Sequence, residues 1–368
     1  MIKILFTINY FTNGGPSNVI KNIMCTLDKK KYDVTLMTFT TGNNPDCINN
    51  LKKQKINVIE CNIQRSYIKT FANMKRIQKM IQELNPDVIH ASGVYNGLIV
   101  ANTKILATKV YTVHSNLFED LKNTYGVIKG KMMLYIQLAF FKKYDYVVGC
   151  SKSVFESLQN RCKNLYYVNN GICFTNDDKA GIGKKIRDEL GIPQEALVYI
   201  FCGHLNVHKR IVELVEMMKN SMKNDEYFII LGDGIYYEKL LSESNNQIKV
   251  LGFKTNVSDY LSASNIYISN SDTEGFSIAV IEALSHGLCL LLSDIKSHSD
   301  VFKIDKNVYL GETYNKDFYE KKEKLYKNYK TIDQKSIQNF QKKYLSNESM
   351  TQGYEKFYLS NINKKEMR

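Results

Sequence analysis

The stretch "SDTEGFSIAVIEAL", residues 271–284, sets two glutamates on either side of an apolar run. Glu274 precedes a glycine in a predicted loop, whereas Glu282 lies inside an otherwise apolar helical pattern, where an unpaired charge is costly to bury. If the helix begins near Ser277, Glu282 shares a face with the small Ala279, which leaves room for a ligand to reach the carboxylate. A surface carboxylate is the alternative interpretation of Glu282.

The residues between the two glutamates suit a ligand that carries phosphates or hydroxyls. The amides of Gly275, Phe276 and Ser277 are predicted to point out of the amino terminus of the helix, where amides attract anions. A carboxylate only accepts hydrogen bonds, so the vicinal hydroxyls of a sugar or a ribose are suitable partners for it. Glu274 has a second interpretation, as an acid that stabilises the helix dipole by about 0.3–1 kcal/mol.

Outward from this stretch, short apolar strands alternate with helical segments along the chain, as in "IKILFTI" (2–8) and "LVYIFCG" (197–203). This alternation is typical of parallel sheets that are covered on both faces. A polar stretch interrupts the pattern, which then restarts. We therefore predict an α/β fold with two Rossmann-like, doubly wound domains. The predicted N-terminal domain is 1–172 and the predicted linker is 173–193. The predicted C-terminal domain is 194–335, followed by a helical tail at 336–368.

The composition narrows the class of protein. No run approaches the roughly 18 apolar residues of a membrane span, and the start of the chain lacks the pattern of a signal peptide. The eight cysteines form no CxxC pair and no cluster at metal-ligand spacing, which fits a reducing cytoplasm. The net charge of +13 favours anionic partners, such as nucleotide sugars or an anionic membrane face. Because the lysines are dispersed and no nucleic-acid-binding module is recognisable, we predict no nucleic-acid partner.

Several unusual residues follow predicted strands, where open parallel sheets bind their ligands. Gly14 and Gly15 lead from the first strand into a helix and permit a close approach to the backbone, although a plain turn is the alternative. A dinucleotide site is disfavoured because the GxGxxG pattern is absent. His114 ends another strand, where a structural histidine is the alternative interpretation.

The segment "FCGHLNVHKR" (201–210) follows the first strand of the second half. Gly203 suits a tight turn, and Lys209 lies near the start of the next helix, where a cation opposes the helix dipole. An anionic ligand such as a diphosphate, held between them, explains the lysine; a solvated lysine is the alternative. Further glycine turns follow strands at Gly232, Gly234 and Gly252.

As an ordered set, these motifs resemble the retaining family-four glycosyltransferases, which have the GT-B fold. The resemblance rests on "EGFSIAVIEAL", "GHLNVHK" and "NNGI", and it extends over nearly the whole chain through "NGGP", "VHS", "GDG", "LGF" and "YLSNESMTQGYEKFY". It implies that the two domains face a central cleft, with the nucleotide sugar on the C-terminal domain and the acceptor on the N-terminal domain. It also implies that the C-terminal helix crosses back and packs on the first domain.

The resemblance also implies a role for each matching residue. Glu282 would bind the ribose hydroxyls, Glu274 the hydroxyls of the transferred sugar, and Lys209 the diphosphate. His114 would lie near the sugar ring, and Gly15 would face the donor phosphate across the cleft. The predicted catalytic residues are His114, Glu274 and Lys209, and the predicted donor-binding residues are Gly14, Gly15, Gly203, His204, Lys209, Gly232, Gly234, Gly252, Phe253, Glu274, Gly275, Phe276, Ser277 and Glu282.

The implied reaction moves a sugar from a nucleotide-diphosphate sugar to a glycan or polyprenyl-diphosphate-linked acceptor, with retention of anomeric configuration, in capsule, exopolysaccharide or lipopolysaccharide synthesis. No DxD-like motif follows a strand, so no cofactor and no essential metal are expected. His204 departs from the family pattern, which has an arginine there with a five-donor fork. Two alternatives stay open, a catalytically silent nucleotide-sugar-binding subunit of a glycan synthase and a GT-B epimerase.

A segment of the N-terminal half mixes lysines with large apolar residues: "LKNTYGVIKGKMMLYIQLAFFKKYDY" (121–146). Packing on the domain is one interpretation. The other is peripheral contact with the anionic inner face of the cell membrane, which would bring a cytoplasmic enzyme to a lipid-linked acceptor.

Overall fold

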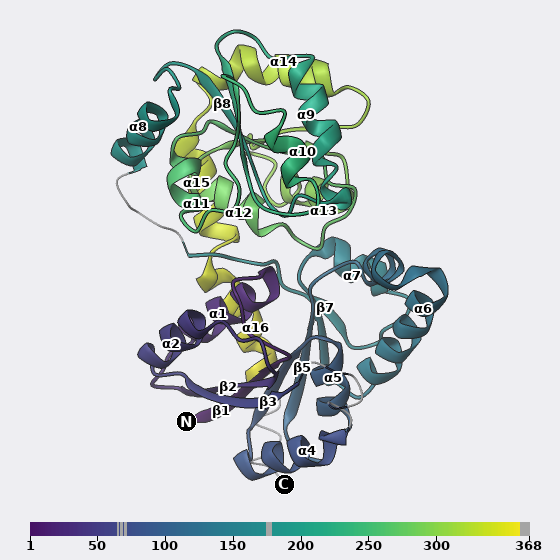
Figure 1. Cartoon of the computed structure of the whole chain (residues 1–368). Helices are drawn as coiled ribbons and strands as arrows, with labels where there is room; N and C mark the ends of the chain where they lie inside the picture. Colours follow the sequence, from purple (N-terminus) through teal and green to yellow (C-terminus); the bar gives the residue numbers. More distant parts are fainter. Residues whose placement is uncertain (65, 67–68, 70–71, 174–178, 361–368) are drawn as a thin grey trace. The chain divides into compact units, whose positions relative to one another are not determined.

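The computed structural model describes residues 1–64, 66, 69, 72–173 and 179–360. It divides into two compact units (Figure 1). The first comprises Met1–Gly171 together with the end of the chain from Asn347, and the second comprises Ile172–Ser346. Each unit is an α/β sandwich around its own parallel sheet, so the predicted fold class is confirmed.

The first unit is built on a parallel sheet with the strand order β3-β2-β1-β4-β5-β6-β7. The chain therefore reverses direction across the sheet beside β1, which places a topological switch point between β1 and β4. The strands of this sheet in the described part of the chain are β1 (Ile2–Ile8), β2 (Tyr32–Thr40), β3 (Asn57–Ile63), β4 (Val88–Ser92), β5 (Thr108–Val113), β6 (Tyr146–Gly149) and β7 (Leu165–Tyr167).

Helices cover both faces of this sheet, as Figure 1 shows, with α1, α2 and α16 on one face and α4, α5 and α6 on the other. Their bounds are α1 (Gly15–Thr26), α2 (Pro45–Lys53), α4 (Met74–Leu84), α5 (Val94–Ala101), α6 (Leu117–Phe141), α7 (Lys152–Leu158) and α16 (Asn347–Leu359). No helix in the described ranges is both long and apolar enough to cross a bilayer.

The C-terminal helix α16 is held on the first unit by a buried polar network. His90 of β4 shares hydrogen bonds with Tyr358 at 2.7 Å and with Thr112 of β5 at 2.7 Å, and Thr112 shares another with Tyr354 at 2.9 Å. Burial lowers the pKa of His90 to about 3, so its ring is neutral at physiological pH and suits this network.

The second unit is built on a parallel sheet with the strand order β10-β9-β8-β11-β12-β13. Its switch point lies between β8 and β11, which are direct neighbours. The strands described for this unit are β8 (Leu197–Cys202), β9 (Glu226–Leu231), β10 (Ile248–Val250), β11 (Ile266–Ser269), β12 (Cys289–Ser293) and β13 (Gly311–Tyr314).

The helices of the second unit include two that stand in segments predicted as linker and tail. Helix α8 occupies most of the stretch 173–193 and packs against α11, while α15 packs against α12. The helical elements are α8 (Lys179–Leu190), η1 (Val207–Lys209), α9 (Ile211–Lys219), α10 (Tyr237–Leu241), α11 (Val257–Ser262), α12 (Ile278–Ser285), α13 (Lys296–Phe302), α14 (Phe318–Asn328), η2 (Tyr329–Thr331) and α15 (Gln334–Tyr344).

Candidate functional site

Lys209 and Glu274 meet at the switch point of the second sheet. Lys209 follows β8 in the short helix η1, and Glu274 follows the neighbouring strand β11, so both stand beyond the carboxyl ends of adjacent strands. The Nζ of Lys209 forms an ion pair with Oε1 of Glu274, and Ser271 donates its hydroxyl to the same oxygen at 2.8 Å. Two residues 65 positions apart in the sequence thus form one charged cluster.

The surroundings keep Glu274 ionised. Burial alone would raise its pKa, but the charges of Lys209 and His298 and the hydrogen bonds from Lys209 and Ser271 outweigh burial and hold the pKa below its ordinary value. A carboxylate that is ionised and only 13% exposed is an efficient acceptor for ligand hydroxyls.

Glu282 has the opposite electrostatic environment. The helix predicted from its apolar pattern is confirmed as α12, whose core side includes Val280, Ile281 and Leu284. Burial raises the pKa of Glu282 to about 7. In the part of the chain that the structure describes, its carboxylate has no hydrogen-bond or ion-pair partner. This mostly buried acid is therefore destabilising in the free protein and suited to a ligand that brings its own donors.

The start of α12 lies between the two glutamates. Ser277 precedes the helix in an extended conformation, and its hydroxyl does not cap the helix. The helix begins at Ile278, so the amides of the first turn are directed away from the helix body. Gly275 and Phe276 complete the connection from Glu274, with the Phe276 ring buried in the core at 6% exposure. Glu274, the amides at the start of α12 and Glu282 thus follow one another in a single continuous segment, in the order predicted from the sequence.

The glycine turns of the second unit crowd together at the ends of β8, β9 and β10. A side chain at Gly232 would place its Cβ 1.8 Å from the carbonyl oxygen of Gly203, and one at Gly234 would lie 2.5 Å from that of Leu205. Gly252 has a positive φ of 71°, and its carbonyl oxygen accepts a hydrogen bond from the amide of Gly232 at 2.9 Å. Close backbone packing therefore requires glycine at 232 and 234, and the positive φ favours it at 252. Phe253, next in the chain, is 67% exposed.

His204 is exposed beside these turns, and its ring orientation is fixed. Its Nδ1 lies 2.6 Å from the carbonyl oxygen of Asp233, so Nδ1 carries the proton and donates to it. Only Nε2 is left for a ligand. It accepts hydrogen bonds when the ring is neutral and donates to an anion only when the ring is protonated.

The three remaining predicted residues lie in the first unit. Gly15 begins α1 after β1, and neither it nor Gly14 has a positive φ or backbone within contact distance of an added Cβ. The fold therefore does not demand glycine there. His114 follows β5, its Nε2 shares a hydrogen bond with the hydroxyl of Ser92 at 2.7 Å, and burial lowers its pKa to about 4. It is a neutral histidine at physiological pH.

The sequence analysis missed two residues of the charged cluster, Ser271 and His298. His298 of α13 is 1% exposed, and its Nδ1 donates to the carbonyl oxygen of Ser293 at 2.9 Å. Ser293 in turn donates its hydroxyl to the carbonyl oxygen of Ser271 at 2.6 Å. Both residues follow strands, β11 and β12, so the rule that ligands bind at carboxyl ends was the available signal.

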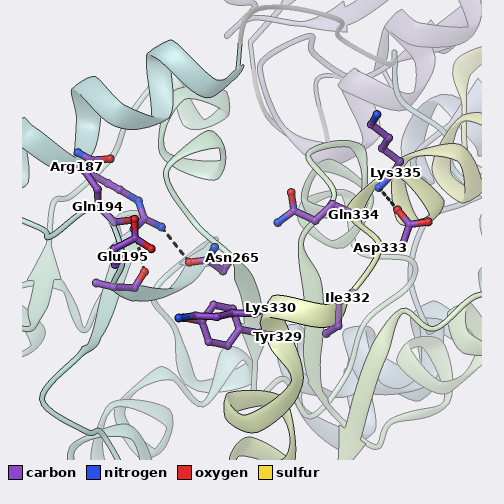
Figure 2. A pocket seen from close by; sticks show the side chains of 11 residues that line it. Arg187, Gln194, Glu195, Asn265, Tyr329, Lys330, Ile332, Asp333, Gln334 and Lys335 are labelled. Atoms are coloured by element: carbon purple, nitrogen blue, oxygen red, sulfur yellow. Dashed lines mark hydrogen bonds between the residues drawn. The ribbon is translucent and has the colours of Figure 1, made fainter.

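A hollow of about 550 Å³ lies at the opposite end of the same sheet (Figure 2). Asn265 and Ala196, which line it, directly precede β11 and β8. Its arginine, Arg187, donates to the carbonyl oxygens of Ala263, Pro193, Gln194 and Ala196 and to Oδ1 of Asn265, at 2.8–3.2 Å. Because every nitrogen of the guanidinium already binds the backbone or Asn265, this hollow is a structural feature and not the candidate site.

The chain matches two family models that lie one after the other. Residues 13–174 match Glycosyltransferase Family 4, and residues 183–343 match Glycosyl transferases group 1. Together they account for most of both units.

Curated relatives and solved structures agree with these matches. The chain is 24% identical to the O-antigen biosynthesis glycosyltransferase WclY of Escherichia coli, over 82% of each chain. It is 24% identical, over 78% of each chain, to the UDP-Gal:alpha-D-GlcNAc-diphosphoundecaprenol alpha-1,3-galactosyltransferase of Escherichia coli. The crystal structure of Anabaena Alr3699/HepE in complex with UDP superimposes with a TM-score of 0.79 at 15% identity, covering 98% of this chain and 100% of that one.

Proposed function

The chain belongs to the GT-B glycosyltransferases, with a Family 4 first half and a group 1 second half, and on that basis we propose that it transfers a sugar from a nucleotide-diphosphate sugar to a lipid-linked glycan. The transfer retains the anomeric configuration and serves the synthesis of a surface polysaccharide. The names of the relatives support this assignment, since they describe O-antigen synthesis and a diphosphoundecaprenol acceptor.

One observation carries the proposal, namely two carboxylates of opposite character on either side of a helix start. Glu282, which is unpartnered in the described structure, accepts the ribose hydroxyls, and Glu274 accepts hydroxyls of the transferred sugar. Lys209 and the first-turn amides of α12 stabilise the negative charge that develops on the departing diphosphate. His114 is a neutral hydrogen-bond partner for the sugar, and Gly14 and Gly15 permit close approach of the donor phosphates.

The glycine turns receive the nucleotide base in this proposal. Gly203, Gly232, Gly234 and Gly252 form the backbone surface at the ends of three strands, and the exposed Phe253 ring is available for stacking. Because Lys209 and the amides supply the positive charge, catalysis needs no divalent ion, and turnover is expected to be unchanged in EDTA.

The first test is a thermal-shift panel of nucleotide sugars and their nucleoside diphosphates. Stabilisation follows the ratio of ligand concentration to dissociation constant, so the panel ranks donors before the acceptor is known. With the best donor, Lys209→Ala and Glu274→Ala should each lower turnover by roughly 10²- to 10³-fold, as loss of one transition-state donor does. Binding of no nucleotide by the wild type would contradict the proposal.

A silent donor-binding subunit is the second candidate, and His204 is the observation that favours it. Its Nδ1 is committed to Asp233, so its neutral ring offers a phosphate no donor. Such a subunit would bind a nucleoside diphosphate but consume no donor with lipid-linked acceptors or with water. Release of nucleoside diphosphate over time, measured with the donor that the panel selects, separates the two candidates.

The first unit presents an apolar stripe to solvent, on α6. The helix breaks at Gly126, whose φ is 77°, and the arm after the break exposes Ile128, Met132 and Tyr135 at 85%, 56% and 71%. These positions are spaced by four and three residues, so they share one face. Exposed lysines flank the stripe at Lys122, Lys129, Lys131 and Lys142.

We propose that this stripe, together with its lysines, docks on an anionic bilayer, where the lipid-linked acceptor resides. Apolar side chains enter the headgroup boundary, and each lysine near an anionic surface contributes about 1 kcal/mol. The double change Ile128→Glu with Tyr135→Glu should abolish co-sedimentation with phosphatidylglycerol vesicles, and raised salt should weaken binding of the wild type. Ile235→Glu, at a residue 73% exposed in the second unit, is the matched control and should bind normally. Equal binding of all three proteins would refute the docking face.

A further inference from the structure

The proposed function places a second demand on Lys209. In the free protein, Lys209 is the ion-pair partner of Glu274, and among the described residues no other lysine or arginine pairs with this carboxylate. A donor diphosphate needs the same ammonium group. When Lys209 turns to the diphosphate, Glu274 keeps the hydroxyl of Ser271 among the described residues and accepts the sugar hydroxyls, but none of these partners carries a positive charge. A largely buried carboxylate that loses its cation is strongly destabilised unless another positive group replaces it.

His298 interacts electrostatically with Glu274, and one of its ring nitrogens is unused in the described structure. Its Nδ1 is bound to the carbonyl oxygen of Ser293, and the hydrogen bonds from Ser293 to Ser271 and from Ser271 to Glu274 connect the ends of β11 and β12. Its Nε2 is buried and has no partner among the residues described. With Nδ1–H donated to Ser293, the neutral ring offers only an acceptor at Nε2, which cannot bind a carboxylate.

The charges that face His298 come from three elements. Lys209 on η1 disfavours a proton on the ring, whereas Glu274 after β11 and Asp294 after β12 favour one. In the free protein, burial and Lys209 prevail, and the pKa of His298 lies below its ordinary value. The influence of Lys209 changes when a donor binds, because the two negative charges of the diphosphate neutralise the lysine and leave one further negative charge near the ring.

We propose that donor binding exchanges the partner of Glu274. Lys209 moves its ion pair from Glu274 to the diphosphate, His298 takes one proton from solvent onto Nε2, and the protonated ring donates that N–H to Glu274. His298 is thus a positioning residue that holds the sugar-binding carboxylate in the loaded site. The inference rests on the proposed function, since it requires a diphosphate at Lys209.

The test is calorimetric binding of UDP and of GDP at pH 7 in two buffers of different ionisation enthalpy. The dependence of the measured heat on the buffer gives the number of protons taken up. Wild type should take up more protons than His298→Asn, by a fraction approaching one per nucleotide. Asparagine preserves a donor near the Nδ1 position but carries no titrating nitrogen, and Glu282 and His204 contribute equally to both proteins.

His298→Gln separates the proton from the hydrogen bond. Glutamine offers an N–H at the position of Nε2 without titrating, so this variant should keep wild-type affinity and lose the additional proton uptake. His298→Asn should bind the nucleotide sugar about tenfold or more weakly, the usual effect of losing a hydrogen bond to a charged group.

An NMR measurement on the wild-type protein tests the exchange even if the His298→Asn variant fails to fold. The chain contains six histidines, and the ¹⁵N resonance of the His298 Nε2, assigned by its absence in His298→Gln, should change from the unprotonated to the protonated range when nucleotide is added. If neither nucleotide binds wild type, the proposed function fails and the exchange fails with it. If nucleotide binds with equal proton uptake in wild type and His298→Asn, or without a change at the His298 Nε2, the exchange alone is overturned.

Discussion

At the scale of single residues, Glu282 shows a conflict between stability and binding. Its carboxyl is mostly buried without a partner in the described structure, and burial raises its pKa from an unfolded value near 4.5 to about 7. An acid with a raised folded-state pKa contributes stability below pH 4.5 that is lost as the pH rises through about 7. The free protein therefore carries this cost at neutral and alkaline pH.

Glu282→Gln should remove that cost. We expect the variant to be more stable than wild type at pH 8 by up to about 3 kcal/mol, because each pKa unit corresponds to roughly 1.4 kcal/mol. At pH 4.5 the two proteins should have similar stability. Urea unfolding at both pH values measures the difference, and nucleotide affinity measured alongside should fall in the variant. A variant less stable than wild type at pH 8 would show that Glu282 has a stabilising partner.

At the scale of helices and strands, α8 shows what a polar composition conceals. Its sequence is part of a stretch predicted as a linker, yet Arg187 anchors the helix on the second unit through four backbone carbonyls and Asn265. Gly183 also packs closely, since an added Cβ would lie 2.2 Å from the carbonyl oxygen of Ser262 on α11. The helix is therefore integrated by these backbone contacts together with the buried side chain of Ile186.

Arg187→Met should destabilise the second unit by about 3 kcal/mol, because several buried carbonyls lose their donor at once. Lys185→Met on the same helix is the control, since Lys185 is a surface residue whose side chain is 78% exposed, and a change there should stay within about 0.5 kcal/mol. Urea unfolding followed by circular dichroism checks both. Equal stabilities would indicate that water replaces the guanidinium.

The elements and the two glutamates could be predicted because their signals are local. The alternation of apolar runs and glycine turns marks the strands and helices of a doubly wound sheet in their sequence order. Glu282 is recognisable because it is the acid among apolar neighbours such as Ile281 and Leu284 within two helical turns. The partners Ser271 and His298 depend on how β11 and β12 align side by side, which no local pattern contains. The orientation of His204 likewise depends on the carbonyl of Asp233, 29 residues away.

At the scale of the whole molecule, the two units are expected to respond differently to acid. In the first unit, burial lowers the pKa of His90 to about 3 and that of His114 to about 4. Bases with lowered folded-state pKa contribute stability above their unfolded value near 6.5, and this stability is lost as the pH falls. In the second unit, acid relieves the cost of burying the Glu282 carboxylate, but it also removes stability at His298, whose pKa is lowered by burial.

Lowering the pH from 7 to 5 should destabilise the first unit by about 2 kcal/mol for each of His90 and His114. In the second unit, protonation of Glu282 should offset the loss at His298 by about 2 kcal/mol over the same range, and this offset should be absent in Glu282→Gln. Hydrogen exchange resolved by peptide, with correction for the intrinsic effect of pH, reports the two units separately. Unchanged stability of the first unit between pH 7 and pH 5 would contradict the assignment of neutral histidines, and an identical response of the second unit in Glu282→Gln would contradict the raised pKa of Glu282.

The return of α16 to the first unit also sets the order in which the molecule can be completed during translation. The second unit is one continuous stretch, Ile172–Ser346, whereas the first awaits Tyr354 and Tyr358 for the network around His90. Ribosomes add roughly 5–20 residues per second, so the last helix of the first unit is synthesised on the order of ten seconds or more after the strands of its sheet. The amino-terminal half is thus made first and finished last, and during that interval it is the half exposed to chaperones and proteases.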